Sequence, residues 1–318
     1  MELKNILICG IGGVGGYFGG IIAHKLSQLD IKANKVYFLA RGQHLKKIRE
    51  NGLELHTSDN ETLICTPTIA SDNINDFPIP DLCFICVKSY DLDDLSNKLK
   101  TFITEKTVII PLMNGIDIHE RIRANLKIGM VLPTCVYVGS HVEKPGLVMQ
   151  SGNPGFFHFG SDPKYPKFNP RVLQEFLNKM GIKSDWKVNP YISIWEKYIL
   201  VASFALVCAY TGQTMGDVIN DDNHIKMVKD LMKEIILIAE KKGIHPLSKT
   251  IIEDTIEFCK DYPDIKPSYQ RDIEKGRKNE GDLFGGTIIR LGKSLGIPTP
   301  VTASIYKKKN NYEINKKK

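Results

Sequence analysis

The sequence lacks most of the features that would place it in a special class of protein. It contains only 2 tryptophans, no internal repeat, and no low-complexity segment ahead of its lysine-rich end. Its first residues, MELKNILICGIGG, include an acidic side chain and reach glycine too early for a secretory signal. With 318 residues, of which 42% are hydrophobic and 25% charged, the chain is typical of a two-domain globular protein, and we expect it to be cytoplasmic.

The sequence also lacks an apolar run that would make a good membrane span. Residues 198–216 carry no charge, and a segment of that length could cross a bilayer. The apolar character is concentrated in residues 198–210, however, and Gly212, Gln213 and Gly216 interrupt its continuation. We therefore predict a buried core helix here and expect no membrane partner.

The body of the chain has no large excess of charge. The net charge is +7, but residues 307–318, with six lysines and one glutamate, account for +5 of it. No basic helix is interleaved with aromatic residues, and no zinc-finger signature is present. We expect no nucleic-acid partner, and binding through the lysine-rich tail is kept as a remote alternative.

Metal sites and disulfides are not expected either. The seven cysteines lie mostly in apolar runs, and the CxxC of Cys83 and Cys86 falls within DLCFICVK, a pattern typical of a buried strand. Residues three apart on a strand point to opposite faces, so these two thiols could not share a metal ion or form a bridge. We interpret the cysteines as buried, inert thiols.

The first half of the sequence predicts an α/β fold. Continuous apolar runs at residues 4–10, 35–41, 81–88 and 107–115 are separated by helical patterns such as 14–29. Continuous apolar strands are typical of a parallel sheet covered on both faces. We therefore predict a Rossmann-type, doubly wound sheet. Turn signals within residues 131–160 predict antiparallel hairpins that close the edge of this sheet.

The second half is predicted to be an all-helical domain. A polar, proline-rich stretch at residues 161–170 suggests a boundary, and we divide the chain into domains at 1–166 and 167–318, the second ending in the basic tail. The predicted helices cover residues 170–181, 191–212, 221–243, 247–260, 268–276 and 280–295.

A glycine-rich motif follows the first predicted strand. In GIGGVG, Gly10, Gly12 and Gly15 satisfy the pattern GxGxxG. The first glycine permits a tight turn, the second lets a pyrophosphate approach the backbone, and the third lets helix and strand pack closely. Because the motif lies between a strand and a helix, we predict a dinucleotide-binding first domain with contacts from Gly10, Ile11, Gly12, Gly13, Val14 and Gly15.

The end of the second predicted strand indicates which dinucleotide binds. An NAD site is expected to have an acidic residue there, but FLARG has Arg41. A cation at this point accommodates the 2′-phosphate of NADP. We therefore predict NADPH as the cofactor.

Two polar residues end the next two predicted strands. Lys88 lies in CVKSYD and Asn114 in LMNGID. Ligands of open α/β sheets bind outside the carboxyl ends of the strands, so both residues are candidates for cofactor and substrate contacts. An ordinary turn is the alternative interpretation of the Asn-Gly pair.

Together and in this order, these motifs resemble those of the ketopantoate reductases (2-dehydropantoate 2-reductases), over most of the chain. The resemblance includes GIGGVG, the arginine of LAR, VK at the third strand, NG at the fourth, and the WxK of WEKYIL. It also includes KPSYQRDIEKGRKNEGDLFGG, which is similar to the S-M-x-x-D…G-x-x-T-E-x-D-x-x-x-G block of that family.

The resemblance implies NADPH-dependent reduction of a 2-oxo acid to a 2-hydroxy acid, first of all ketopantoate to pantoate in pantothenate biosynthesis. It implies Lys197 as the general acid and Glu280 as its partner. Asn114 and Lys88 would lie beside the nicotinamide and substrate, and Ser268 would contact the substrate carboxylate. The chemistry agrees, because reducing a ketone makes an alkoxide that needs a positive charge and a proton, and a protonated lysine supplies both.

Ser268 and Glu280 could reach one substrate only if the helical region between them breaks, because a continuous helix of that length would span about 18 Å. The sequence offers Gly276 as a C-cap and Asn279 as a new N-cap, with Asp282 three residues further on. We therefore predict a helix–turn–helix here.

The chain departs from the family pattern where amides are expected. The asparagines expected four and eight residues after the lysine are Val201 and Ala205, an Asn-Gly pair is Met215-Gly216, and Ile265 stands near the place of another asparagine. A pocket with fewer polar groups discriminates differently between substrates.

Three matters therefore stay open in the sequence. One alternative is a reductase of the same fold that acts on a more apolar 2-oxo acid or carbonyl. A second is a non-catalytic NADP(H)-binding regulator, which should lack the pair Lys197 and Glu280. The oligomeric state is the third, since helical second domains of this kind often pair and a homodimer would result.

Overall fold

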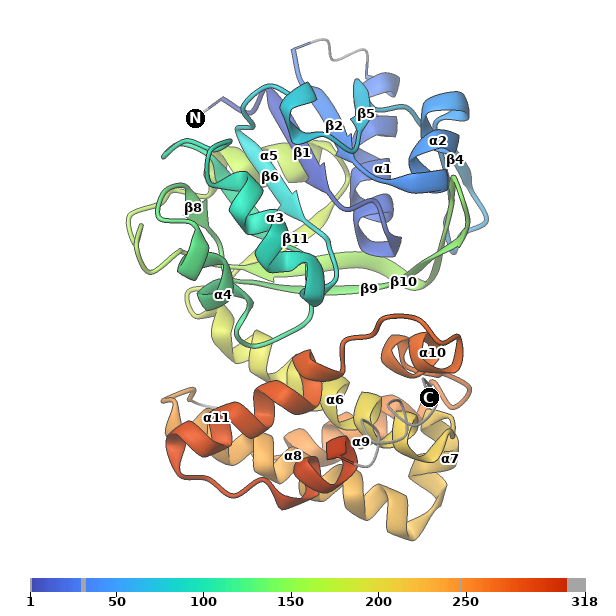
Figure 1. The fold of residues 1–318 in the computed structure, drawn as a ribbon, viewed down its shortest axis with the longest axis vertical. Helices are drawn as coiled ribbons and strands as arrows, with labels where there is room; N and C mark the ends of the chain where they lie inside the picture. The colour runs from blue at the N-terminus through green and yellow to red at the C-terminus, as the bar shows by residue number, and fades with distance from the viewer. Residues whose placement is uncertain (1, 30–32, 246, 308–318) are drawn as a thin grey trace. The chain divides into compact units, whose positions relative to one another are not determined.

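The computed structural model describes residues 2–29, 33–245 and 247–307 (Figure 1). The chain forms two compact units that divide between Pro190 and Tyr191. This division lies later in the chain than the expected boundary at residue 166. Most of the lysine-rich tail, from residue 308 onward, lies outside the described residues.

The first unit contains a parallel sheet, sheet A, in the strand order β5-β2-β1-β6-β7-β8. Every described pair in it is parallel. Four of its strands correspond to the predicted apolar runs, and β5 and β8 extend its two sides. The strands are β1 (Asn5–Cys9), β2 (Lys35–Leu39), β5 (Ile69–Ser71), β6 (Leu82–Ile85), β7 (Val108–Pro111) and β8 (Met130–Val131).

Helices cover both faces of sheet A, as predicted. α1 (Gly13–Gln28) connects β1 to β2, and α3 (Leu92–Leu99) connects β6 to β7 in the opposite direction along the sheet. Since such crossovers are right-handed, the two helices lie on opposite faces (Figure 1). α2 (Gly42–Asn51) follows β2, and α4 (Ile118–Asn125) packs with α3.

A second sheet, sheet B, was not predicted. Its strand order is β11-β10-β3-β4, with β9 paired to β10 as an antiparallel hairpin. The hairpin was predicted, but its place at the edge of the parallel sheet was wrong. The strands are β3 (Leu53–His56), β4 (Thr62–Cys65), β9 (Thr134–Lys144), β10 (Leu147–Phe159) and β11 (Lys183–Trp186).

The glycines of α1 explain why a second sheet can pack there. A Cβ on Gly16 would lie 2.6 Å from Cγ2 of Val148 on β10, and one on Gly20 would lie 3.3 Å from Sγ of Cys65 on β4. Helix α1 therefore contacts sheet A with one side and sheet B with the side that carries Gly16 and Gly20. This arrangement buries the helix between two sheets.

The boundary between the units differs from the expectation because α5 (Arg171–Lys179) and β11 belong to the first unit. β11 pairs in parallel with β10, from Phe156 opposite Lys183 to Phe159 opposite Trp186. The proline-rich stretch at 161–170 is thus a connection within the first unit.

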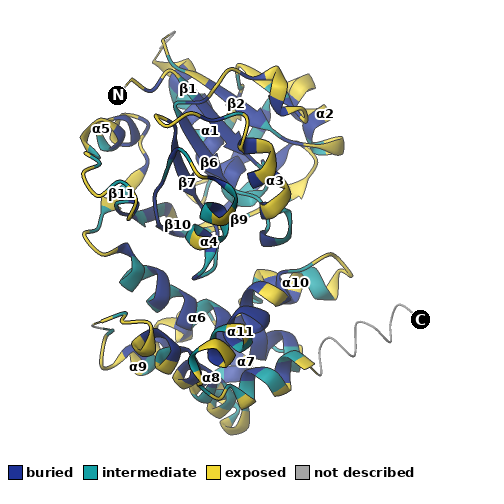
Figure 2. Cartoon of the chain, turned by 60° about the vertical axis from the view of Figure 1, so that its left-hand side comes forward, coloured by how far each residue is buried: buried dark blue, intermediate teal, exposed yellow. Residues whose placement is uncertain are grey.

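The described part of the second unit is helical, as predicted. Its longest helix, α6, is long and apolar enough to cross a membrane, but 67% of its most apolar window is buried inside the protein. Figure 2 shows that burial. The elements are α6 (Pro190–Thr211), α7 (Met215–Asn220), α8 (Asp222–Lys241), α9 (Ile251–Lys260), α10 (Ser268–Glu274), a π-helical turn η3 (Asp282–Gly286), α11 (Thr287–Leu295) and a last helix at 300–307.

Candidate functional site

The glycine-rich loop joins β1 to α1 as its motif requires. Gly10 has φ of 93°, and a Cβ there would lie 2.9 Å from Cγ1 of Val87. A Cβ on Gly15 would lie 2.9 Å from Cβ of Cys86, whereas one on Gly12 would have no atom within 4 Å. The first and third glycines are therefore required by the protein itself, and open space beside Gly12 lets a phosphate approach the start of the helix.

The other three residues of the loop pack against the rest of the first unit. The side chain of Ile11 is buried in the core, and that of Val14 packs against the core. A Cβ on Gly13 would lie 2.5 Å from the carbonyl oxygen of Ser140 on β9. The β9–β10 hairpin of sheet B thus lies directly against the first turn of α1.

His44 on α2 gives the hairpin a second attachment, which the sequence did not reveal. The backbone N–H of Gly146, in the turn of the hairpin, donates to Nδ1 of His44 at 2.9 Å. Burial lowers the pKa of His44, and the backbone of Ile11 partly offsets this. The ring is therefore neutral near pH 7 and accepts at Nδ1, which leaves its proton on Nε2.

The remaining candidates of the first unit lie at the carboxyl edge of sheet A. Arg41 follows β2, Lys88 follows β6, and Asn114 follows β7. Parallel strands place their carboxyl ends at the same edge, which is also where the glycine loop leaves β1. Arg41 is 79% exposed, and Lys88 and Asn114 are partly buried.

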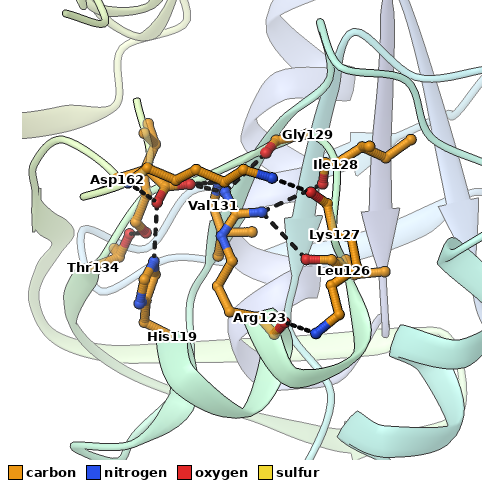
Figure 3. Close-up of polar contacts among 11 residues, drawn as sticks. His119, Arg123, Leu126, Lys127, Ile128, Gly129, Val131, Thr134 and Asp162 are labelled. Atoms are coloured by element: carbon orange, nitrogen blue, oxygen red, sulfur yellow. Dashed lines mark hydrogen bonds and ion pairs between the residues drawn. The ribbon is translucent and has the colours of Figure 1, made fainter. Parts of the chain in front are cut away.

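A buried ionic cluster holds α4, the helix that begins shortly after Asn114 (Figure 3). Asp162 is fully buried and accepts from the backbone N–H of Val131 at 2.8 Å, and it is paired with the guanidinium of Arg123. Nε2 of His119 lies 3.4 Å from Asp162 Oδ1. The cluster therefore connects α4 with β8 and the connection after β10.

A carboxylate that the sequence did not single out also lies at this edge. Asp91 Oδ2 is 2.7 Å from Nη2 of Arg41. Its only sequence signal was its place three residues after Lys88, in CVKSYD.

The second unit contains the other three candidates. Lys197 is partly exposed on α6, Ser268 is exposed at the start of α10, and Glu280 is 7% exposed just before η3. Their sequence neighbours contact one another. The Tyr198 hydroxyl is shared between the carbonyl oxygens of Leu283 and Phe284, at 2.8 and 2.9 Å.

Tyr269 completes this convergence within the second unit. Its ring centroid lies 5.8 Å from that of Phe284, and a Cβ on Gly281 would lie 2.9 Å from its hydroxyl oxygen. The residues next to Lys197, Ser268 and Glu280 thus belong to three segments that meet.

The predicted break between Ser268 and Glu280 is confirmed. Helix α10 ends at Glu274, Gly276 has φ of 63°, and Asn279 Oδ1 accepts from the N–H of Gly281 at 3.1 Å. The segment turns back and brings Gly281 to Tyr269, which a continuous helix would prevent.

Two of the apolar replacements lie side by side. The N–H of Met215 donates to the carbonyl oxygen of Ile265 at 3.0 Å, and that of Gly216 donates to the carbonyl oxygen of Pro263 at 2.8 Å. On α6, Val201 is partly buried and Ala205 is 1% exposed.

The cysteines of the CxxC motif have different neighbours. Cys83 Sγ lies 3.7 Å from Cys9 Sγ on the adjacent strand, whereas Cys86 lies beside Gly15. The Cys83 contact and burial together raise the pKa of Cys9, and burial raises the pKa of Cys86. Among the described residues, no group of three or more metal-ligating side chains gathers.

Two family descriptions match the chain, and together they cover most of it. Ketopantoate reductase PanE/ApbA matches residues 6–164, and the C-terminal part of the same family matches residues 192–313. The chain belongs to the ketopantoate reductase family. Ketopantoate reductases are oxidoreductases, which agrees with the glycine-rich, dinucleotide-binding type of loop between β1 and α1.

Individual relatives of this ketopantoate reductase family member cover nearly its whole length. The uncharacterized oxidoreductase YkpB of Bacillus subtilis is 27% identical over 98% of this chain and 100% of its own. A PanE/ApbA family ketopantoate reductase from Ralstonia eutropha has a TM-score of 0.88 at 24% identity, covering 99% of this chain and 100% of its own. D-mandelate dehydrogenase with NADH and anilino(oxo)acetate has a TM-score of 0.84 at 21% identity, covering 98% and 99%. At these identities the two solved structures show a common fold.

Proposed function

We propose that this chain is a cytoplasmic, NADPH-dependent reductase of a 2-oxo acid, with 2-dehydropantoate as its substrate and pantoate, in pantothenate biosynthesis, as its product. The observation that carries the proposal is the meeting of three segments in the second unit, which brings the neighbours of Lys197, Ser268 and Glu280 together. The first unit would bind the cofactor, and the second would supply the acid and the substrate contacts.

The residues of the first unit fit a phosphate-bearing dinucleotide. The open space beside Gly12 lies at the start of α1, and the exposed guanidinium of Arg41 lies at the same edge of sheet A. When bound, the cofactor supplies the hydride. The backbone of the glycine loop would hold its pyrophosphate, and Lys88 and Asn114 would contact its nicotinamide half and the substrate.

In the second unit, Lys197 would act on the carbonyl oxygen of the substrate. Its ammonium would stabilise the developing alkoxide and donate the proton that completes the hydroxyl group. Glu280, a buried carboxylate, would orient the ammonium and favour its charged form. The exposed hydroxyl of Ser268 would donate to the substrate carboxylate.

A more apolar 2-oxo acid is a second candidate substrate. Val201, Ala205 and Met215 stand where amides are expected, and Met215 lies beside Ile265. D-mandelate dehydrogenase, whose structure was solved with anilino(oxo)acetate, shares the fold. By contrast, a non-catalytic regulator should lack Lys197 and Glu280, and this chain has both.

Loss of NADPH absorbance tests the two substrates directly. We expect turnover on adding 2-dehydropantoate, and weaker turnover with small aliphatic and aryl 2-oxo acids. Turnover of an aryl or larger aliphatic acid without turnover of 2-dehydropantoate would select the second candidate. Absence of turnover with the whole panel, although NADPH binds, would favour the regulator. Sedimentation of the same sample would show whether the chain forms a homodimer.

Arg41→Ala should weaken NADPH binding much more than NADH binding. Only NADPH carries the 2′-phosphate that the guanidinium would hold, so we expect its Kd to rise roughly tenfold or more. Lys46→Ala removes an exposed charge from α2, the helix that begins directly after Arg41, and serves as the control. Equal weakening of the two cofactors by Arg41→Ala would refute the 2′-phosphate role.

A further inference from the structure

The ion pair between Arg41 and Asp91 crosses the end of strand β1. Arg41 follows β2, Asp91 follows β6, and β1 lies between these two strands in sheet A. The pair, with 2.7 Å between Nη2 and Oδ2, therefore joins the segments that follow the two strands on either side of β1, the strand that leads into the glycine loop. In doubly wound sheets the dinucleotide binds outside the carboxyl ends of such strands.

Stability does not account for this pair. The Arg41 side chain is 79% exposed and that of Asp91 is 26% exposed. Exposed ion pairs contribute little to the stability of a fold. The position of the pair therefore points to an effect on whatever binds at this edge.

A carboxylate at this point would act differently on the two nicotinamide cofactors. The 2′-phosphate of NADPH is an anion and would have to share the guanidinium of Arg41 with Asp91 or displace it. NADH has a 2′-hydroxyl in the same place, and this hydroxyl can donate a hydrogen bond to a carboxylate. Asp91 thus opposes the attraction that Arg41 exerts on NADPH and does not oppose NADH.

The acidic residues that follow Asp91 in the chain strengthen this effect. Asp93 and Asp94 follow on α3 and add to the negative charge near Asp91. Arg121 on α4 donates to the carbonyl oxygen of Ser89 at 2.8 Å and lies 3.7 Å from Asp93.

We propose that Asp91 is a specificity-determining residue that lowers the preference of this chain for NADPH over NADH by competing with the 2′-phosphate for Arg41. This inference rests on the proposed function in two respects: a nicotinamide dinucleotide binds at the glycine loop, and Arg41 faces its 2′-position. It assigns opposite effects to the two partners of one ion pair: Arg41 favours the 2′-phosphate, and Asp91 opposes it.

Asp91→Asn tests the assignment by removing the charge with little change of shape. The Kd values of NADPH and NADH are measured at low ionic strength by titration of the full chain, together with those of 2′,5′-ADP and 5′-AMP, which need no substrate. For Asp91→Asn we expect roughly three- to tenfold tighter binding of NADPH and 2′,5′-ADP, with NADH and 5′-AMP changed less than about twofold. Added salt should reduce the gain.

Asp94→Asn is the matched control. It removes the same charge from α3, where Asp94 is 74% exposed and pairs with Lys98 at 2.9 Å, so the cofactor preference should stay within about twofold of the wild type. An equal gain with this control would show a general charge effect and overturn the specific role of Asp91.

Two further results would be decisive. An unchanged ratio of NADPH to NADH affinity in Asp91→Asn would overturn the inference. Weaker binding of NADPH to this variant would also overturn it, because it would show that Asp91 holds Arg41 in a binding position. If the folded wild-type protein bound none of the four probes, the proposed function itself would fail. In Arg41→Ala, the gain from Asp91→Asn should shrink, since no guanidinium is left to compete for.

Discussion

Lys197→Ala should lower kcat for the 2-oxo acid at least about a hundredfold, the range that general acid catalysis contributes. The loss should appear in kcat and much less in KM, because the proton is needed in the transition state and not for binding. Steady-state rates with saturating NADPH measure the effect. The Kd of NADPH should stay within about twofold of the wild type, since every cofactor candidate belongs to the first unit.

Two further variants distinguish the loss of the proton donor from the loss of positive charge and from a general effect on the fold. Lys197→Arg keeps a positive charge but replaces the acid by a group whose pKa is above about 12, so its kcat should also remain low. Lys229→Ala removes an exposed lysine from α8 and should leave kcat unchanged. Partial recovery of Lys197→Ala by added primary amines would support the role as acid, whereas a near-normal rate would remove Lys197 from the mechanism.

Asp162→Ala should destabilise the first unit by about 3–5 kcal/mol, because it leaves the charge of the largely buried Arg123 without its carboxylate partner. It also removes the acceptor for the N–H of Val131 and for that of Lys164, at 2.8 and 3.0 Å. Asp162→Asn keeps an acceptor oxygen and the size of the side chain, so its loss should be smaller.

The two tryptophans allow each unit to be followed separately. Trp186 lies on β11 in the first unit, and Trp195 lies on α6 in the second. With Trp195→Phe as the background, urea unfolding followed by tryptophan fluorescence reports on the first unit alone.

Glu175→Ala is the matched control for this experiment. It breaks an exposed pair with Arg171 and should cost less than about 1 kcal/mol. If Asp162→Ala cost no more than this control, the buried cluster would not be a stabilising element.

The parallel sheet could be predicted because most of its strands coincide with continuous apolar runs in the sequence. Each of these runs is buried on both faces, so it reads as a continuous apolar segment. The glycine loop, Arg41, Lys88 and Asn114 follow such runs, and their place at one edge follows from parallel pairing alone. The break near Gly276 was also predictable, since a glycine is a local signal for the end of a helix. Gly276 has the positive φ that such an end requires.

Sheet B could not be predicted in the same way. Its strands β3, β4 and β11 are short, and β3 pairs with β10 across a large separation along the chain. Apart from the turn signals of the β9–β10 hairpin, the local trace of that sheet was the row of small residues on α1, where Gly16 and Gly20 let β10 and β4 approach. Without the pairing of β11 to β10, the proline-rich stretch at 161–170 looked like the end of a domain.

The sequence by itself determined the family, the fold class and the type of residue at each candidate position, because these depend on motifs whose members lie close together or in a fixed order. The tertiary structure alone decided that Asp91 meets Arg41, that Asp162 meets Arg123, and that Tyr198 holds the segment after Glu280. Each of these contacts joins groups far apart in the chain, and only folding brings them within hydrogen-bonding distance.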